Sequence, residues 1–382
     1  MQIAVRCLQG FEFLLKQELE QLGVSDLKEG NRIVQGTCEL DVLYKVNYCS
    51  RLALRVLVPV HAYSFDSIDE FYLNALNFPW EDWLDPETTF AIDPQVSSLQ
   101  FRHAHFASLK LKDAIADRLR KVYGSRPNVD TENPDVQIHL LVNRDRVQIS
   151  MDSSGRSLNQ RGYRKSGGEA PMNEVLAAGM IRQSGWKGEK SFYNPFAGSG
   201  TLLIEAAYVA FNWPAQYLNR SFNFQTWKNY SDSSWKDVLS KAQNEINSTA
   251  TVKLWGSDID EKQLTVAWKN IAQLPKPDCI DLVRKDFFED GIEHENEVVF
   301  INPPYGERME IDDLNAIYKQ LGHVLKHHYN GCEVWIISSD TEALHAIGLR
   351  PKKKLKTLNG KLDCEIRGMD LFSGTMKSYK TT

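Results

Sequence analysis

Residues 191–207 most constrain what this chain can fold into, because an apolar strand, a Gly-rich turn and a helix-forming run follow one another directly. Gly198 and Gly200 permit the positive φ and the close backbone approach that a ligand-binding turn requires. A phosphate-cradling P-loop is excluded, since Gly200 is followed by Thr201 and not by lysine. The dinucleotide fingerprint is excluded because Leu203 stands where its third glycine belongs. The remaining pattern is typical of an S-adenosylmethionine turn in a Rossmann-like fold, the alternative being a strand–helix turn without a ligand.

Acidic residues follow the next two predicted strands. Asp258 comes after the strand predicted over 252–256, and Asp286 after the strand over 280–283. In a doubly wound sheet, ligands bind beyond the carboxyl ends of the strands. We expect Asp258 to accept hydrogen bonds from ribose hydroxyls, and Asp286 to accept from the adenine amine with Phe287 against the ring. The predicted cofactor-binding residues are Asn194, Pro195, Phe196, Ala197, Gly198, Ser199, Gly200, Thr201, Asp258, Ile259, Asp286 and Phe287.

The most specific signal is Asn302-Pro303-Pro304-Tyr305, which follows a strand predicted over 298–301. The exocyclic amine of a base is a poor nucleophile, because its lone pair is delocalised into the ring. An Asn side-chain oxygen and the next carbonyl can accept both N–H groups and direct that lone pair toward a methyl donor. The prolines stiffen the backbone, Tyr305 offers a stacking face, and positioning then supplies most of the catalysis. Asn302, Pro303, Pro304 and Tyr305 are the predicted catalytic residues, and a plain strand-ending turn is the alternative.

Charge and composition narrow the class of protein. The net charge is −5, yet residues 102–126 hold seven Lys/Arg against two Asp, and residues 350–361 hold six against none. Basic faces on an acidic protein can still neutralise phosphates, because screening acts over about 10 Å. The six cysteines are scattered and no histidine cluster is present, which favours a cytoplasmic protein with reduced thiols and no metal site. We expect neither a signal peptide nor a membrane span.

The N-terminal part is organised differently from the region around the Gly turn. Residues 1–62 alternate short elements as β-α-β-α-β, which favours a small α+β sandwich. A second region contains a helix predicted over 106–123, in which Leu109, Ala116, Leu119 and Val122 form an apolar stripe. Residues 153–168 are polar, Gly-rich and basic, which predicts a linker that also touches the substrate.

Several motifs together resemble a known family, the bacterial THUMP-domain RNA methyltransferases, and specifically the guanine-N2 methyltransferases of large-subunit ribosomal RNA. The resemblance covers essentially the whole chain. The matching stretches are 106–115, QRGYR at 160–164, APMNE at 170–174, residues 194–207, GSDID at 256–260, NPPYGER at 302–308 and LNGKLDC at 358–364. One departure is Asn194, since the family usually begins its turn with Asp-Pro. A negative charge near the donor is therefore missing here.

The resemblance implies a fold and a division of the chain. The fold class is α/β: a Rossmann-like class I methyltransferase domain, doubly wound and mostly parallel with an antiparallel C-terminal strand, preceded by an α+β RNA-binding region. The expected parts are a ferredoxin-like region (1–62), a THUMP RNA-binding domain (63–155), a basic linker (156–168) and a methyltransferase domain (169–382). The implied cofactor is S-adenosyl-L-methionine.

We therefore expect an enzyme that methylates the N2 amine of a guanine in large-subunit ribosomal RNA. The predicted RNA-binding residues are Lys110, Lys112, Arg118, Lys121, Arg161, Arg164 and Lys361. The tetrapeptide also suits an adenine-N6 methyltransferase acting on DNA or RNA, or one acting on a glutamine side chain. A non-catalytic RNA-binding protein that kept the fold is a further alternative, which only Asn194 favours.

Overall fold

The computed structural model describes residues 1–165, 171–218, 220–289, 291, 293–303 and 311–372. Its Cα positions divide into two compact units, each drawn from separate stretches of chain. The first comprises Met1–Cys7, Glu18–Leu158 and Asn219–Ser240, and the second comprises Leu8–Gln17, Asn159–Leu218 and Lys241–Thr382. None of the described helices is both long and apolar enough to cross a membrane.

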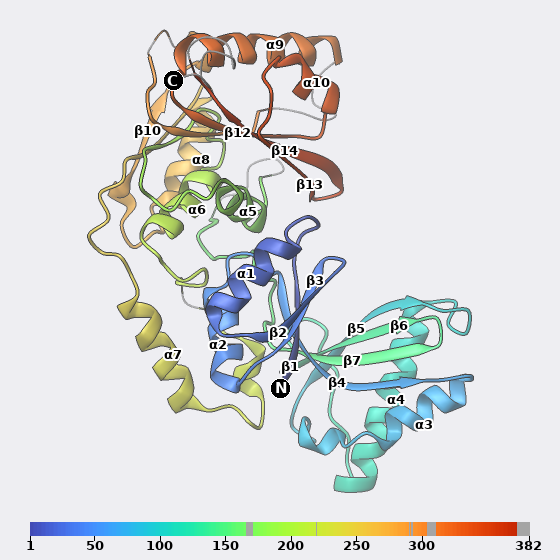
Figure 1. Ribbon diagram of the computed structural model, residues 1–382. Helices are drawn as coiled ribbons and strands as arrows, with labels where there is room; N and C mark the ends of the chain where they lie inside the picture. The colour runs from blue at the N-terminus through green and yellow to red at the C-terminus, as the bar shows by residue number, and fades with distance from the viewer. Residues whose placement is uncertain (166–170, 219, 290, 292, 304–310, 373–382) are drawn as a thin grey trace. The chain divides into compact units, whose positions relative to one another are not determined.

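The first unit is built on a seven-stranded sheet with the order β2-β3-β1-β4-β7-β6-β5 (Figure 1). Its elements in chain order are β1 (Gln2–Arg6), β2 (Ser25–Gly30), β3 (Ile33–Thr37), α2 (Leu40–Cys49), β4 (Arg55–Ser64), α3 (Ile68–Asn77), η1 (Trp80–Asp82), β5 (Phe90–Ser97), α4 (Ala104–Tyr123), β6 (Val136–Asn143), β7 (Arg146–Asp152) and η2 (Asn223–Thr226). Two helices, α1 (Glu12–Leu22) and α7 (Asp232–Asn244), contribute residues to both units. The pairs are antiparallel except β5 with β6, which is parallel.

The sequence patterns missed one strand of this unit. They also predicted an apolar stripe on α4, two residues of which are exposed. The predicted β-α-β-α-β order lacks β2, an edge strand whose residues are almost all exposed and so show no apolar alternation. The observed order β1-α1-β2-β3-α2-β4 is the ferredoxin-like one. In α4 the buried face is formed by Ala107, Leu111 and Ile115, among others. Of the predicted apolar stripe, Ala116 and Leu119 are buried, whereas Leu109 and Val122 are 37% and 43% exposed.

The second unit contains the other seven-stranded sheet, with the order β10-β9-β8-β11-β12-β14-β13. Its elements in chain order are α5 (Glu174–Ser184), β8 (Phe192–Asn194), α6 (Thr201–Ala210), β9 (Leu254–Asp258), α8 (Glu261–Ile271), η3 (Pro277–Cys279), β10 (Ile280–Arg284), η4 (Phe287–Glu289), β11 (Val298–Ile301), α9 (Ile311–His328), β12 (Glu333–Ser338), α10 (Thr341–Ala346), β13 (Lys353–Asn359) and β14 (Leu362–Asp370). Strands β8 to β12 are parallel, while β14 runs antiparallel to β12 and β13. The predicted doubly wound, mostly parallel sheet with an antiparallel C-terminal part is confirmed.

The position of β8 in this sheet fixes where a ligand can bind. Its three residues are buried, and it pairs with β9 on one side and β11 on the other. The chain order of the strands reverses across β8, and ligands of open α/β sheets bind beyond the carboxyl ends of the strands at such a switch point. The helix that follows, α6, is apolar on nearly every side and almost wholly buried, as expected of a helix packed inside a fold.

Candidate functional site

The Gly turn joins β8 to α6 at this switch point, and its two glycines have different tasks. Both take positive φ, 51° at Gly198 and 81° at Gly200. A Cβ added at Gly200 would lie 3.3 Å from the Cβ of Ala267, so this glycine lets α8 pack closely. A Cβ at Gly198 would meet nothing within 4 Å. Gly198 therefore leaves space over the turn, and no side chain caps the N-terminus of α6 beside it.

Asp258, at the end of β9, fastens the turn to the neighbouring strand. Its Oδ2 accepts a hydrogen bond from the Gly198 N–H at 2.9 Å, and its Oδ1 accepts from the Asp260 N–H at 3.0 Å. The Ala197 N–H donates to the Ser257 carbonyl at 2.9 Å. An ionised carboxylate has about four acceptor positions. The half-buried Asp258 thus retains acceptors for a ligand beside Gly198, while the next residue, Ile259, is 59% exposed.

Asn194 is fully buried where β8 ends. Its Nδ2 donates to the Phe300 carbonyl of β11 at 2.8 Å and to the Phe196 carbonyl of the turn at 3.3 Å. Its Oδ1 is buried and has no hydrogen-bond partner among the described residues. Such an acceptor costs about 1–3 kcal/mol unless a donor reaches it. The site therefore holds a buried acceptor that a ligand N–H or O–H group can satisfy.

The residues after β10 correct one sequence-based expectation. Asp286 Oδ1 accepts from the Phe288 N–H at 2.9 Å and so opens η4. Phe287 is 2% exposed, and its ring centroid lies 5.8 Å from that of Tyr329 in the core. Such burial leaves the Phe287 ring little surface for the predicted contact with a ligand ring. Phe288 is half-buried, with its ring 6.3 Å from that of Phe196. It is the better candidate, which a Phe-Phe doublet alone cannot show.

The predicted amine-binding residues follow the other neighbour of β8. The four residues of β11 are buried, and β11 pairs with β8 through Val298↔Phe192 and Val299↔Tyr193. Beyond it, Pro303 is buried, and the buried Oδ1 of Asn302 has no hydrogen-bond partner among the residues described. Pro304 and Tyr305 lie outside the described residues. The Gly turn and Asn302 thus follow the carboxyl ends of adjacent parallel strands.

The segment predicted as a basic linker belongs to the second unit from Asn159 to Lys165, its last described residue. Arg161 and Glu205 are both fully buried, with Arg161 Nε 3.5 Å from Glu205 Oε1. The Tyr163 hydroxyl donates to the same Oε1 at 3.0 Å, and burial, followed by the Glu205 charge, raises the pKa of Tyr163 well above its usual value. The burial of this guanidinium and its pairing with Glu205 argue against the predicted RNA contact of Arg161.

Arg164 also acts inside the unit. Its guanidinium lies 3.1 Å from Glu174 Oε1 and donates to the Met172 carbonyl at 3.0 Å. It also reaches Thr201 Oγ1, the first residue of α6, at 3.4 Å. Its side chain is 21% exposed. Sequence reasoning missed this role of Arg164 as a support of the Gly turn, since nothing local to the motif QRGYR reveals its partners.

The basic residues predicted on α4 differ in how far their charges are available. Arg118 forms an ion pair with Glu81, and Lys112 lies 3.1 Å from Asp113. Lys110 lies over the half-exposed Phe106 ring, 5.8 Å from its centroid. Lys121 is exposed in the last turn of α4. Lys361, in the second unit, is exposed at the turn between β13 and β14.

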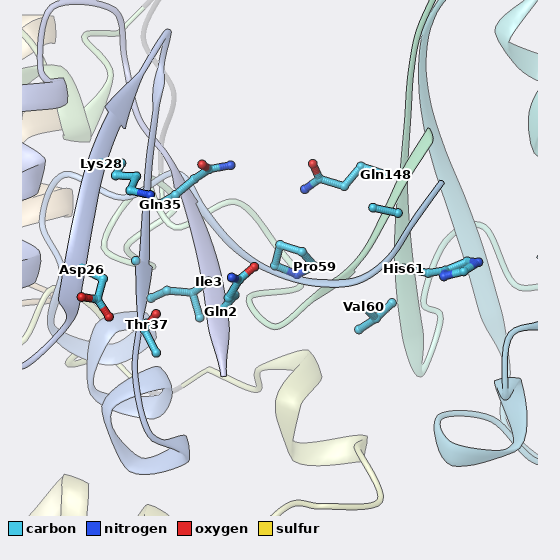
Figure 2. A pocket seen from close by; sticks show the side chains of 12 residues that line it. Gln2, Ile3, Asp26, Lys28, Gln35, Thr37, Pro59, Val60, His61 and Gln148 are labelled. Atoms are coloured by element: carbon cyan, nitrogen blue, oxygen red, sulfur yellow. The ribbon is translucent and has the colours of Figure 1, made fainter. Parts of the chain in front are cut away.

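A polar cleft of about 370 Å³ lies on the sheet of the first unit, where β1 and β4 diverge (Figure 2). Figure 2 shows the amides of Gln35 and Gln148 extending toward the space between them from opposite sides of the cleft, with Lys28 beside Gln35. Over the described part of the chain, no group of three or more His, Cys, Asp or Glu residues can hold a metal ion. The cleft is lined by hydrogen-bonding groups that include Gln35, Gln148 and Lys28.

Sheet order, a Gly turn at the switch point and an acidic residue on the next strand define a class I methyltransferase fold. Comparisons with known proteins agree. A family model described as "RMKL-like, methyltransferase domain" matches residues 161–367, a THUMP domain model matches 65–152, and an RlmL ferredoxin-like domain model matches 2–57. The chain belongs to this RMKL-like methyltransferase family.

Two relatives differ in length. The "Ribosomal RNA large subunit methyltransferase K/L" of Marinomonas sp. (strain MWYL1) is 32% identical over 98% of this chain, which spans 53% of that protein. The "Putative RNA methyltransferase slr0064" of Synechocystis sp. (strain ATCC 27184 / PCC 6803 / Kazusa) is 32% identical and matches 95% of each chain. The chain thus spans about half the length of the K/L relative and nearly all of the cyanobacterial one.

Solved structures are similar over the whole length. SMU.472, a putative methyltransferase complexed with SAH, is 25% identical, with a TM-score of 0.89 over 98% of this chain and 99% of that one. A predicted N6-adenine-specific DNA methylase from Listeria monocytogenes str. 4b F2365 is 26% identical, with a TM-score of 0.86 over 97% and 96% of the two chains.

Proposed function

We propose that this protein transfers a methyl group from S-adenosylmethionine to the exocyclic N2 amine of a guanine in large-subunit ribosomal RNA. The observation that carries the proposal is the pairing of two half-sites on adjacent strands. The Gly turn, held by Asp258, follows β8, and Asn302 follows β11. Each half-site presents a buried side-chain oxygen without a hydrogen-bond partner among the described residues, at Asn194 and Asn302. Two such acceptors suit a cofactor and an amine.

The donor half-site fits S-adenosylmethionine on three features. Space is open over Gly198, the N-terminus of α6 has no side-chain cap, and Asp258 keeps acceptors for ribose hydroxyls. We assign donor binding to residues 194–201, Asp258, Ile259 and Asp286, with Phe288 taking the place expected of Phe287. When bound, the cofactor supplies an electrophilic methyl group on a sulfonium, so the protein needs no strong base. The SAH bound to SMU.472, a relative in fold and sequence, supports this assignment.

The amine half-site acts by positioning. Asn302 Oδ1 and the Pro303 carbonyl accept the two N–H groups of the amine and turn its lone pair toward the donor. The buried Pro303 limits motion of the backbone that presents these acceptors. Pro304 and Tyr305 complete the tetrapeptide in sequence, and Tyr305 is proposed to stack on an extruded base. Alignment of reacting groups can by itself account for about 7–11 kcal/mol of a barrier.

The RNA assignment rests on the N-terminal domains and the relatives. We propose that residues 1–62 and 63–155 form the RNA-binding module and residues 169–382 the catalytic domain. Lys110, Lys112, Lys121 and Lys361 are the proposed phosphate contacts. Arg118 is set aside because its guanidinium donates to both carboxylate oxygens of Glu81, whereas Lys112 makes a single contact with Asp113. The match of residues 65–152 to the THUMP model and the name of the Marinomonas relative support an RNA substrate of ribosomal origin.

A second candidate is adenine-N6 methylation. The similar Listeria structure is described as a predicted N6-adenine-specific DNA methylase, and the acceptors at Asn302 suit any planar amine. A binding protein without catalysis is the third, since Asn194 carries no charge. The second candidate predicts N6-methyladenine as the product, and the third predicts no methylated product.

The deciding experiment is mass spectrometry of nucleosides from the ribosomal RNA and the DNA of cells lacking this gene. We expect loss of N2-methylguanosine from the large-subunit RNA, restored by the wild-type protein and not by Asn302→Ala. Loss of N6-methyladenosine would favour the second candidate. Unchanged nucleosides in both RNA and DNA, together with donor binding that calorimetry cannot detect, would favour the binding protein.

A further inference from the structure

One face of α8 lies against the Gly turn and buries a single polar side chain there. The buried residues of this helix are Leu264, Ala267, Asn270 and Ile271. A Cβ added at Gly200 would lie 3.3 Å from the Cβ of Ala267 and 3.7 Å from Cδ1 of Ile271, so the turn packs on this face. Asn270 is 1% exposed. Burying an amide on an apolar face is unfavourable unless its hydrogen bonds are made, so its partners indicate what the side chain does.

The Asn270 amide joins two segments that are far apart in the chain. Its Nδ2 donates to the Ser199 carbonyl in the Gly turn at 3.0 Å, and its Oδ1 accepts from the Lys165 N–H at 3.0 Å. An Asn side chain carries both donors and an acceptor, so one residue can make both contacts. Arg164, the neighbour of Lys165, reaches Thr201 Oγ1 at 3.4 Å. Residues 164–165 are therefore tied to the turn and to the start of α6 at two places.

The bond to Ser199 fixes one peptide plane of the turn. The Ser199 carbonyl and the Gly200 N–H belong to the same peptide group. That N–H donates to the Ala197 carbonyl at 2.8 Å, while the carbonyl accepts from Asn270. A planar peptide whose two polar atoms are both bonded cannot rotate without breaking one of these bonds. Asn270 thus limits the conformations that the turn can adopt.

We infer that Asn270 is a positioning residue for donor binding, whose amide holds the Gly turn in the conformation that receives S-adenosylmethionine. Asp258 holds Gly198 from β9, and Asn270 holds Ser199 from α8, so the turn is braced from both neighbouring elements. The inference rests on the proposed function, because it takes the Gly turn as the donor site. Without the amide, a smaller fraction of the protein has the turn in the receptive conformation, and the apparent dissociation constant rises by the same factor.

The test compares Asn270→Ala and Asn270→Asp with the wild-type full-length protein, using ribosomal RNA from cells lacking the gene. We expect the donor KM, and the donor dissociation constant from calorimetry, to rise about tenfold, the scale of one lost hydrogen bond. At saturating donor, kcat should stay within about twofold, since bound donor itself selects the receptive turn. Asn270→Asp keeps the side-chain size and the acceptor for the Lys165 N–H, so it isolates the lost donation to Ser199.

The split between KM and kcat separates positioning from stability. Unfolded molecules reduce the number of active enzymes but do not change the donor KM of the folded ones. The matched control is Asn47→Ala in the first unit. Asn47 is likewise buried, and it donates to the Leu43 carbonyl at 3.0 Å and to Ser153 Oγ at 2.9 Å. This control should lower the free energy of unfolding and leave the donor KM unchanged.

Three results would overturn the inference. The Asn270 variants could keep the wild-type donor affinity, lose kcat at saturating donor instead, or fail to fold. If the wild-type protein binds no S-adenosylmethionine, or if Asp258→Ala binds it as tightly as the wild type, the proposed donor site fails instead. If the wild-type protein binds the donor but does not methylate this RNA, the proposed substrate is wrong, while calorimetry still tests Asn270.

Discussion

Replacing Arg161 distinguishes an internal role from the RNA-binding role that its sequence context predicts. Arg161 and Glu205 are both 0% exposed, and Tyr163 donates to the same carboxylate oxygen. Removing one member of a buried ion pair costs about 3–5 kcal/mol, because the partner charge stays desolvated. We expect Arg161→Ala to lower the free energy of unfolding of the second unit by this amount. Tyr163→Phe, which removes one hydrogen bond, should cost about 1 kcal/mol.

The assays are urea unfolding of the full-length protein and RNA filter binding at urea concentrations well below the unfolding midpoint. Arg161→Ala should shift the midpoint of the transition that reports the second unit and leave RNA affinity in the folded protein almost unchanged. Replacing both charged residues by apolar ones, Arg161→Met together with Glu205→Leu, should recover part of the lost stability, since no unpaired charge remains. Normal stability of Arg161→Ala, together with weaker and less salt-dependent RNA binding, would refute the reasoning and indicate that Arg161 contacts phosphates.

Four further changes test other parts of the molecule. Asp258→Ala should weaken donor binding by about 1.5–3 kcal/mol, the scale of a hydrogen bond to a charged group. A donor affinity that calorimetry finds unchanged would mean that Asp258 does not bind the donor. Asn302→Ala should reduce turnover by orders of magnitude with donor affinity largely kept; equal losses in both would mean that it serves the cofactor. Lys121→Glu should weaken RNA binding more at low salt than at high salt, whereas Arg118→Ala, whose charge is already paired, should alter the salt dependence less. Burial, followed by the Arg6 charge, lowers the pKa of His139 from 6.5 to about 4. The unfolded chain then binds more protons, so unfolding free energy should fall as pH drops from 6.5 toward 4, and His139→Gln should flatten that slope.

Much of the second unit could be predicted because its signals are local. The strand observed at Val298–Ile301 has the bounds expected from its apolar run, and the one at Ile280–Arg284 is one residue longer than predicted. Asp258 and the Gly turn could be paired in advance, since carboxyl ends of parallel strands share one edge of a sheet. Positive φ at Gly198 likewise followed from residue type. The motif at Asn302 indicated the kind of chemistry, though not that the Asn302 Oδ1 would be buried.

What the sequence alone determined was the kind and order of the elements and the place of the chemistry along them. Periodicity, glycines and prolines act within a few residues and need no partner. Only the tertiary structure decided which charges are free and which rings are covered. The burial of Arg161 depends on Glu205, and that of Phe287 on Tyr329, both distant in the chain. Burial and pairing are properties of what packs against a side chain, and one sequence pattern is compatible with either outcome.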